Sequence, residues 1–258
     1  MNIFLNNNIR YEKLAEQQST SSKLNSYIMA VNEAVNNDKS FITFKKSRAY
    51  KEVLEHVDIN LAREYYSRIR ELIDNEKDFN QMISKSKKND LIGTPELFNF
   101  ENHKISGTTL RYLYVFLHIK KIFKNKKFKR IIEIGGGYGG QCLIYDLLSD
   151  IDSYKILDLP SVNNLSKKYL NHHYLNCSFD ALDVNNFFDD EFDLCISNYA
   201  FSELPRKLQD IYMNKVIKKS KHLFMIMNTG NDSKKIIETK KYKYSDLLKL
   251  FPDLNYLD

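Results

Sequence analysis

The sequence predicts an α/β fold: a mostly parallel, doubly wound sheet with helices on both faces, preceded by an N-terminal helical extension. After residue 130, five short apolar segments alternate with helical segments, an order typical of parallel sheets. Before residue 100 the chain holds one glycine and one proline, and its apolar residues recur at helical spacing. These two observations divide the chain into a helical region, residues 1–100, and a sheet-containing domain, residues 101–258.

The five apolar segments are suited to buried strands. They read RIIEI, YKILDL, FDALDV, FDLCISN and HLFMIMN, and the helical patterns GGQCLIYDLLS, VNNLSKKYLN and PRKLQDIYMNKVIKK lie between most of them. Ligands of such sheets bind beyond the carboxyl ends of the strands. The functional residues are therefore expected just after each strand.

The first hundred residues are expected to form helices. LNSYIMAVNEAVNN is one, and YKEVLEHVDINLAREYYSRIRELIDN, residues 50–75, is read as a second, longer one. LIGTPELF contains a Gly and a Pro and predicts a turn or loop. ISGTTLRYLYVFLHIKKIF then predicts a helix that begins through the capping residues at 106–109.

Composition indicates a protein without a membrane span. The chain has 258 residues, 43% of them hydrophobic, and no apolar run approaches the ~18 residues that a spanning helix requires. The opening MNIFLNNNIRYEKL lacks the features of a secretory signal, so we expect a cytoplasmic protein. Cys142, Cys177 and Cys195 lie in apolar settings without C-x-x-C spacing, which favours buried, reduced thiols.

The formal net charge is +6, and lysine supplies most of it. The densest basic run, KKIFKNKKFKR at residues 120–130, holds seven basic residues in eleven. Such a surface can attract nucleic acid, anionic lipid or a phosphorylated small molecule. Because lysine is frequent throughout the chain, a solvated face is the simpler interpretation, and net charge leaves the partner open.

Glycine is concentrated at one place. Five of the eight glycines lie within residues 135–140, where the first strand should turn into its helix. The pattern Glu133-x-Gly135-x-Gly137-x-Gly139 lets the backbone turn tightly and a ligand approach the main chain. Gly135, Gly137 and Gly140 also satisfy G-x-G-x-x-G, which by itself is weak evidence for a nucleotide site.

Acidic residues after the second and third strands narrow the choice of ligand. Asp158 ends the second strand, 23 residues after Gly135, close to the ~20 expected for a carboxylate that binds both ribose hydroxyls. The spacing indicates a ligand that contains adenosine, as both NAD and S-adenosylmethionine do. Glu133, two positions before the first glycine, favours S-adenosylmethionine, whose ammonium and sulfonium are positive. Asp183 follows the third strand, where the adenine amino group is held in such enzymes.

The chain resembles the sugar O-methyltransferases of bacterial surface-polysaccharide clusters, which are class I S-adenosylmethionine-dependent enzymes with a Rossmann-like fold. The resemblance lies in NDLIGTPELF, ISGTTLRYLY, IIEIGGGYGGQ, YKILDLPSVNNLSKKYL and FDLCISNYAFSEL, in this order, and covers roughly residues 89–230. It implies that S-adenosylmethionine is converted to S-adenosylhomocysteine, in capsule or surface-polysaccharide biosynthesis. It also implies that the first hundred residues act as a substrate lid, a region where the match is loose.

The resemblance assigns roles by position. Glu133 and the first glycines would line the methionine end of the donor, Asp158 would hold the ribose, and Asp183 the adenine. Asn198 would lie beside the sulfonium. The full expected cofactor-binding set is Glu133, Gly135, Gly136, Gly137, Asp158, Leu159, Asp183, Val184 and Asn198. No metal site is expected, because Asp158, Asp183 and Asp193 are dispersed at strand ends.

The expected chemistry is an in-line displacement at the sulfonium methyl by an acceptor oxygen, helped by a general base. The candidates for this base are Glu203, five residues after Asn198, and His103, expected in the loop before the LRY helix. For Glu203 a helix-start carboxylate is an equal alternative, and for His103 an exposed loop histidine is the simpler interpretation. Tyr199 and Arg111 are candidates for acceptor binding, and Arg111 could instead pair with the donor's carboxylate. The acceptor is expected to be a hydroxyl of a sugar, a sugar nucleotide or a related phosphorylated small molecule.

Three other functions stay open at this point. An NAD-dependent oxidoreductase would need a second nucleotide-binding half, which the sequence does not show. A nucleic-acid methyltransferase acting on base amino groups usually has an N/D-P-P-Y/F segment, where this chain has SNYAF; RNA or another small molecule remains an alternative acceptor. A non-catalytic binding module that retains the fold is the third possibility.

The sheet is expected to be incomplete at one edge. After the fifth strand, YSDLLKLF predicts a last helix and LNYLD one short apolar run, whereas a full class I sheet ends in a two-strand hairpin. An uncovered edge strand tends to pair with a neighbour, so a homodimer is expected as one way to cover it.

Overall fold

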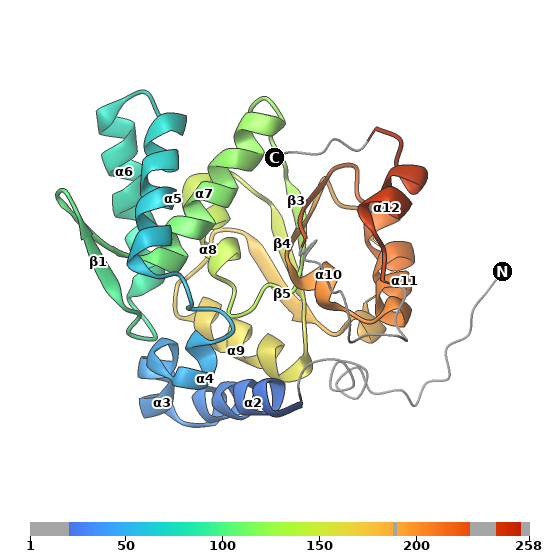
Figure 1. Ribbon diagram of the computed structural model, residues 1–258, viewed down its shortest axis with the longest axis horizontal. Helices are drawn as coiled ribbons and strands as arrows, with labels where there is room; N and C mark the ends of the chain where they lie inside the picture. Colours follow the sequence, from blue (N-terminus) through green and yellow to red (C-terminus); the bar gives the residue numbers. More distant parts are fainter. Residues whose placement is uncertain (1–20, 188–189, 228–240, 254–258) are drawn as a thin grey trace.

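The computed structural model describes residues 21–187, 190–227 and 241–253 (Figure 1). At its centre is a five-stranded parallel sheet of order β5-β4-β3-β6-β7. The strands are β3 (Arg130–Ile134), β4 (Ser153–Leu157), β5 (Ser178–Leu182), β6 (Leu194–Asn198) and β7 (Leu223–Ile226). All five match the predicted strands, and together with the surrounding helices they confirm the predicted Rossmann-like α/β fold.

The strand order reverses beside the central strand, β3. The chain runs from β3 outward through β4 to β5, then crosses back to β6 on the other side of β3. Ile134 at the end of β3 pairs with Leu157 on one side and Ser197 on the other. The residues that follow β3, β4 and β6 therefore meet at one edge of the sheet, the position where such folds bind ligands.

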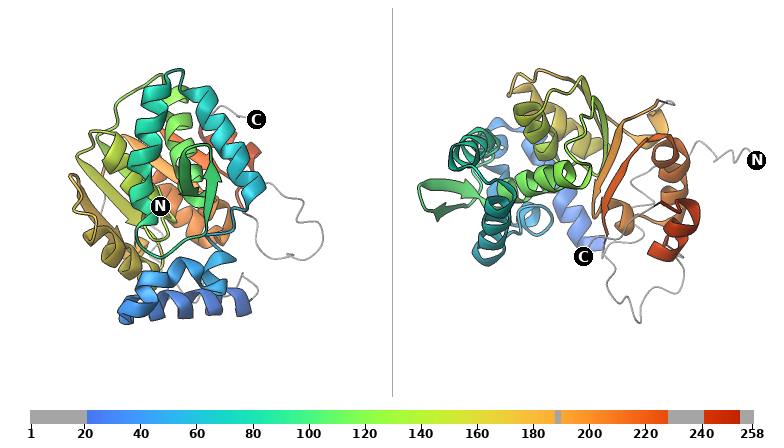
Figure 2. Two further views of the ribbon diagram at one scale, coloured as in Figure 1. Left: turned by 90° about the vertical axis from the view of Figure 1, so that its left-hand side faces the viewer. Right: turned by 90° about the horizontal axis from the view of Figure 1, so that it is seen from above.

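Helices cover both faces of the sheet (Figure 2). The helices α7 (Gly107–Ile122), α8 (Gly140–Leu148) and α9 (Pro160–Asn171) share one side with the N-terminal helices. The helices α10 (Ala200–Glu203), α11 (Arg206–Lys215) and α12 (Tyr244–Leu250) lie on the other side. The helices predicted after the first, second and fourth strands, and the last helix, are thus confirmed.

The N-terminal region is helical, as predicted, but its long helix is not continuous. The helices are α2 (Ser21–Asn36), α3 (Asp38–Thr43), α4 (Arg48–Lys51), α5 (Ile59–Leu72) and α6 (Glu76–Ser86). The single helix predicted over residues 50–75 is wrong, because residues 52–57, which we call the strap, separate α4 from α5. The Asp58 side chain accepts a hydrogen bond from the Leu61 N–H and so starts a new helix.

A two-stranded hairpin replaces the predicted loop before α7. Its antiparallel strands are β1 (Leu97–Phe100) and β2 (His103–Ser106), and they turn at Glu101, whose φ is +47°. The prediction that His103 lies in a loop is therefore wrong. The hairpin is stabilised by tertiary packing, since the Phe100 ring stacks on Tyr66 with centroids 4.8 Å apart. The start of α7 is as predicted, because the Ser106 hydroxyl caps it by accepting from the Thr109 N–H.

Three further predictions concern the C-terminal end of the chain, membrane spans and the cysteines. The apolar run LNYLD, residues 254–258, lies outside the described residues, and so does Asn228, the last residue of the fifth predicted strand. Among the described helices, none has the length and apolar character needed to cross a membrane. All three cysteines are buried and none forms a disulfide.

Candidate functional site

The glycine turn, residues 135–139 between β3 and α8, has a backbone that only glycine adopts easily. Gly135, Gly137 and Gly139 have φ of +77°, +56° and +92°, in the left-handed region. A Cβ added to Gly135 would lie 2.1 Å from the Cβ of Ala200, at the start of α10. The turn therefore presents bare main chain to the segment that follows β6.

Asp158 joins the end of β4 to this turn. Its carboxylate accepts hydrogen bonds from the Gly137 N–H at 2.9 Å and the Leu159 N–H at 2.7 Å. Burial raises the pKa of Asp158 to about 6, against the lowering effect of these two N–H donors. The carboxylate lies beside the turn, where the sequence places it, and in this structure it holds the turn's backbone.

Glu133 lies beneath the turn and is only 2% exposed. One carboxylate oxygen accepts from the Tyr154 hydroxyl at 2.8 Å, and the other from the Asn198 amide at 3.4 Å. The side-chain carbonyl oxygen of Asn198 is buried and has no hydrogen-bond partner. Burial raises the pKa of Glu133 to about 7. The structure thus brings together Glu133, the glycine turn, Asp158 and Asn198.

The raised pKa of Glu133 implies that the free energy of unfolding depends on pH. Its folded-state pKa lies above the unfolded value of 4.5, so the stability it contributes is complete below pH 4.5 and is lost as pH rises through 7. We expect the free energy of unfolding to fall more steeply between pH 5 and pH 8 in the wild type than in Glu133→Gln. The shift at Asp158 has the same direction and is present in both proteins. Denaturant titrations at four pH values check this, and parallel curves would contradict it.

The turn after β6 contains a strained residue. Tyr199 has φ of +70°, a conformation that is unfavourable for a bulky side chain and that concentrates at functional sites. Its N–H donates to the Ile226 carbonyl at 2.8 Å, and its carbonyl accepts from the Ser202 hydroxyl at 2.6 Å. Glu203 ends the short helix α10 that follows, and is exposed. Tyr199 therefore lies at the same edge of the sheet as the glycine turn.

The strap covers the glycine turn from the N-terminal side. A Cβ at Gly137 would lie 2.8 Å from Leu54 Cδ1. The Leu54 carbonyl accepts from the Arg111 guanidinium at 3.3 Å, while Arg111 Nε is buried without a partner. Glu55 also has a buried carboxylate oxygen without a partner, and burial raises its pKa. Arg111 thus contacts the strap, which packs on the glycine turn and which sequence reasoning missed.

The helix α2 also reaches the site. Tyr27 is buried, and the charge of Asp158 adds to burial in raising the pKa of its hydroxyl. Nothing in the local sequence connects Tyr27 to a residue 131 positions later. For the strap the sequence does contain a signal, since Asp58, a good helix-starting residue, lies inside the predicted continuous helix.

The motifs NDLIGTP and ISGTT form a polar hub beneath the glycine turn. The Asn89 side chain donates to the Thr109 hydroxyl at 2.7 Å and to the Tyr138 hydroxyl at 2.9 Å. The Asp90 carboxylate accepts from the Ser106 and Thr109 hydroxyls at 2.7 and 2.6 Å. Tyr138 belongs to the glycine turn, so these motifs support the turn from below.

His103 lies apart from this cluster, whereas Asp183 and Val184 follow β5, the strand that pairs with β4 just before Asp158. His103 is on β2 and contacts Asn80 and Phe79 of α6; the hairpin is at the left of Figure 1 and α10 toward the right. Asp183 follows β5, and its carboxylate accepts from the Asn185 N–H at 2.7 Å. Val184 is buried, and its carbonyl accepts from Lys215 at 3.1 Å.

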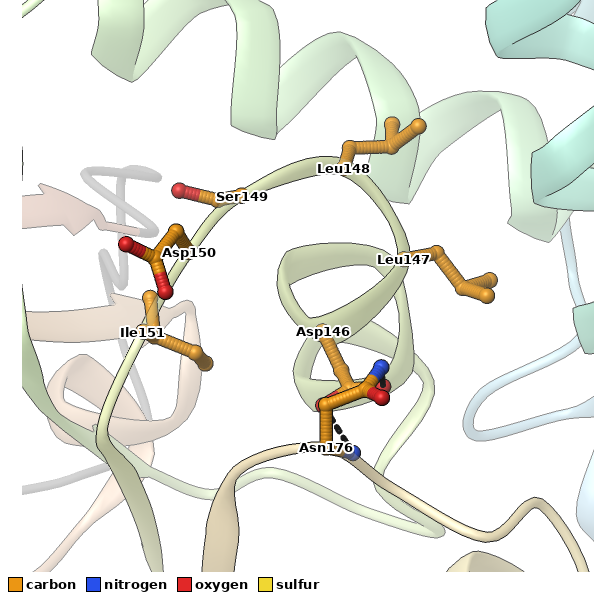
Figure 3. A pocket seen from close by; sticks show the side chains of 7 residues that line it. All are labelled: Asp146, Leu147, Leu148, Ser149, Asp150, Ile151 and Asn176. Atoms are coloured by element: carbon orange, nitrogen blue, oxygen red, sulfur yellow. Dashed lines mark hydrogen bonds between the residues drawn. The ribbon is translucent and has the colours of Figure 1, made fainter.

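A surface pocket of about 370 Å³ lies elsewhere (Figure 3). It is lined by residues 146–151, at the end of α8 and before β4, and by Asn176. This is the opposite end of the sheet from the glycine turn. Its Asp146 carboxylate accepts from the Asn176 and Cys177 N–H groups at 2.8 and 2.9 Å, so it fastens a loop. Within residues 21–187, 190–227 and 241–253, no three His, Cys, Asp or Glu side chains gather as metal ligands would.

Among the comparisons with known proteins, the search of solved structures finds similar proteins. No family model matches the chain, and neither does any curated protein. A protein of Thermoplasma acidophilum is 19% identical with a TM-score of 0.38, over 58% of this chain and 69% of its own. The N-methyltransferase NodS of Bradyrhizobium japonicum, solved with S-adenosyl-L-homocysteine, is 16% identical with a TM-score of 0.34, over 44% and 56%. Phosphoethanolamine N-methyltransferase 2 of Haemonchus contortus, solved with S-adenosyl-L-methionine, is 15% identical with a TM-score of 0.39, over 62% and 35%.

The chain thus spans little more than half of NodS and about a third of the Haemonchus enzyme. Because these TM-scores are low, the fold assignment rests on the sheet order and register of the chain itself.

Proposed function

We propose that the protein is an S-adenosylmethionine-dependent methyltransferase. The observation that carries the proposal is the joining of a glycine turn, a buried Glu133 and the carboxylate of Asp158 at the switch point of a parallel sheet. Two features fit the methionine end of the donor: the bare backbone at Gly135, and the unpartnered carbonyl oxygen of Asn198. The donor, when bound, supplies a methyl group on a positively charged sulfur.

The residues of the site then have distinct tasks. The negative charge of Glu133 and the Asn198 carbonyl favour the cationic end of the donor, and Gly135 to Gly137 allow close approach. Asp158, with Leu159 beside it, holds the ribose hydroxyls, and Asp183 and Val184 bind the adenine. Binding at Asp158 requires its carboxylate to add ribose contacts to those it makes with Gly137 and Leu159.

The proposed acceptor is a sugar hydroxyl, free or on a nucleotide- or phosphate-linked sugar of surface-polysaccharide synthesis. The sequence resemblance supports this class, and Arg111 offers a cation for a phosphate. Residues 1–100 form the lid over the acceptor, which the contact of Leu54 with the glycine turn supports. Glu203, rather than His103, is the proposed general base, because it follows the β6 turn whereas His103 lies against α6.

Glu203→Gln is expected to lower turnover about 100-fold, the range of a general base, and to leave donor affinity nearly intact. The matched control is Asp150→Asn, an exposed carboxylate at the opposite end of the sheet, which should keep full turnover. Turnover and donor affinity are measured on the same preparations. Unaltered turnover in Glu203→Gln would move the base to another residue.

Two measurements test the function itself. Isothermal titration with S-adenosylmethionine and with NAD decides between methyl and hydride transfer, and tight NAD binding without donor binding would refute the proposal. Incubation with a panel of nucleotide sugars, followed by mass spectrometry, should show a gain of one methyl. Methyl incorporation into RNA but into no sugar would instead assign the RNA alternative.

A further inference from the structure

Lys45 is a fully buried lysine next to the glycine turn. It lies in the short 3₁₀ helix η1 (Phe44–Lys46), and its side chain is 0% exposed. Its ammonium donates one hydrogen bond, to the Asn89 carbonyl at 2.6 Å. Aromatic rings surround the rest of the charge: Tyr138 with its centroid 4.1 Å away, Tyr169 at 5.0 Å and Phe44 at 5.7 Å. A lysine is buried this completely only where the structure compensates its charge.

Tyr138, the nearest ring, is the only side chain of substance within the glycine turn. It lies between Gly137 and Gly139, and it is itself 0% exposed. Its hydroxyl accepts from the Asn89 amide, and Tyr169 packs edge-on at 4.8 Å. Because Gly137 and Gly139 have no side chains, Tyr138 is the side chain that anchors the turn, in addition to the hydrogen bond from the Gly137 N–H to Asp158.

The ammonium therefore acts on the turn in two ways. It acts on the Tyr138 ring directly, by a cation–π interaction, and it fixes Asn89, which in turn holds the Tyr138 hydroxyl. Both contacts join residues far apart in the sequence, since Lys45 precedes Asn89 by 44 positions and Tyr138 by 93. No other lysine in the described part of the chain is fully buried.

We propose that Lys45 is a positioning residue that holds the glycine turn, through Tyr138 and Asn89, in the shape that binds the methyl donor. This rests on the proposed function for the identity of the ligand, but not for the effect on the turn. The residues that the Lys45 ammonium binds are outside the expected cofactor set, so it acts on the donor through the turn.

The energetics of the buried charge support this role. Burial lowers the pKa of Lys45 to about 8, although Glu55 on the strap and Asp90 in the hub both act to raise it. Tyr138 and Tyr169 also face the ammonium, and burial, followed by the charge of Lys45, lowers the pKa of His173, after α9. Because the folded-state pKa is below the usual 10.5, stability should increase as pH rises from about 8 to 10.5. The buried charge thus destabilises the fold. A residue with a purely structural role would be expected to stabilise it.

The test compares Lys45→Met, which keeps most of the volume, with Lys45→Arg, which keeps the charge. We expect Lys45→Met to bind S-adenosylmethionine about 10-fold more weakly, because the cation–π contact with Tyr138 is lost, with Tm unchanged or raised. Amide hydrogen exchange at residues 135–140 should be faster. Lys45→Arg should recover part of the affinity.

In the wild type, affinity for S-adenosylmethionine should fall as pH rises through 8, and this decrease should be absent in Lys45→Met.

Lys168→Met is the matched control. Lys168, on α9, also contacts a ring, Phe41 at 4.7 Å, and donates to the Ala34 and Val35 carbonyls at the end of α2, away from the turn. It should leave donor affinity and exchange at residues 135–140 unchanged. Equal losses in both variants would show that Lys45 merely docks the N-terminal helices, and would overturn the inference.

The two proposals fail in different ways. Donor binding by the wild type with unchanged affinity and exchange in Lys45→Met leaves the methyltransferase proposal standing and refutes the role of Lys45. No donor binding by the wild type refutes the methyltransferase proposal, and hydrogen exchange at residues 135–140 then decides alone whether Lys45 positions the turn.

Discussion

Replacing Gly135 by alanine is expected to abolish measurable donor binding and to lower the free energy of unfolding by about 2–5 kcal/mol. Two costs add. The φ of +77° costs a residue with a Cβ about 1–2 kcal/mol, and the new methyl would lie 2.1 Å from Ala200 Cβ, an overlap of the kind that costs about 1–3 kcal/mol. Denaturant unfolding and isothermal titration with S-adenosylmethionine measure the two effects.

A second substitution separates the two costs. Ala200→Gly removes the methyl that Gly135→Ala would meet, but it cannot relieve the torsion at residue 135. The double variant should therefore recover about half of the lost stability, less about 1 kcal/mol for a glycine at the start of α10. If Gly135→Ala alone proves as stable as the wild type, the turn does not have the geometry described.

Asp158→Ala is expected to weaken donor binding about 30-fold, or on the order of 2 kcal/mol, the value of a charge-assisted, two-point contact. The structure adds a second reason for the loss. The carboxylate also accepts from the Gly137 N–H at 2.9 Å, so its removal frees the turn. Isothermal titration measures the effect.

Asp158→Asn distinguishes these contributions. It keeps an acceptor for the Gly137 N–H but loses the charge and one of the two acceptor oxygens. Binding intermediate between the wild type and Asp158→Ala is expected. An unchanged dissociation constant in Asp158→Ala would contradict the ribose role.

The local signals of the sequence were sufficient for the sheet and for part of the site. Each strand of the sheet is a short apolar run, and strand pairing in a βαβ unit follows from chain order and a fixed handedness. Residues directly after β3, β4 and β6 must then meet at one edge, which is why Gly135, Asp158 and Asn198 could be placed together before the structure was known.

Other features escaped the sequence because they depend on contacts across the chain. The hairpin β1–β2 has strands of only four residues and is held by Tyr66 and α5 packing, so its own residues carry little strand signal. The strap interrupts a run of helical spacing, since its apolar residues Leu54 and Val57 pack on Gly137 and Gly107 instead of continuing a helix face. His103 lies on this hairpin and is therefore remote from the site.

The sequence by itself determined the fold, the glycine turn and the carboxylates near it, because torsional freedom and periodicity are properties of neighbouring residues. Only the tertiary structure decided what lies around that turn: Leu54 against Gly137, Tyr27 near Asp158, and the buried charge of Lys45 over Tyr138. These contacts join residues 83 to 131 positions apart, and such pairs depend on how the N-terminal helices pack on the sheet. No local pattern encodes that packing.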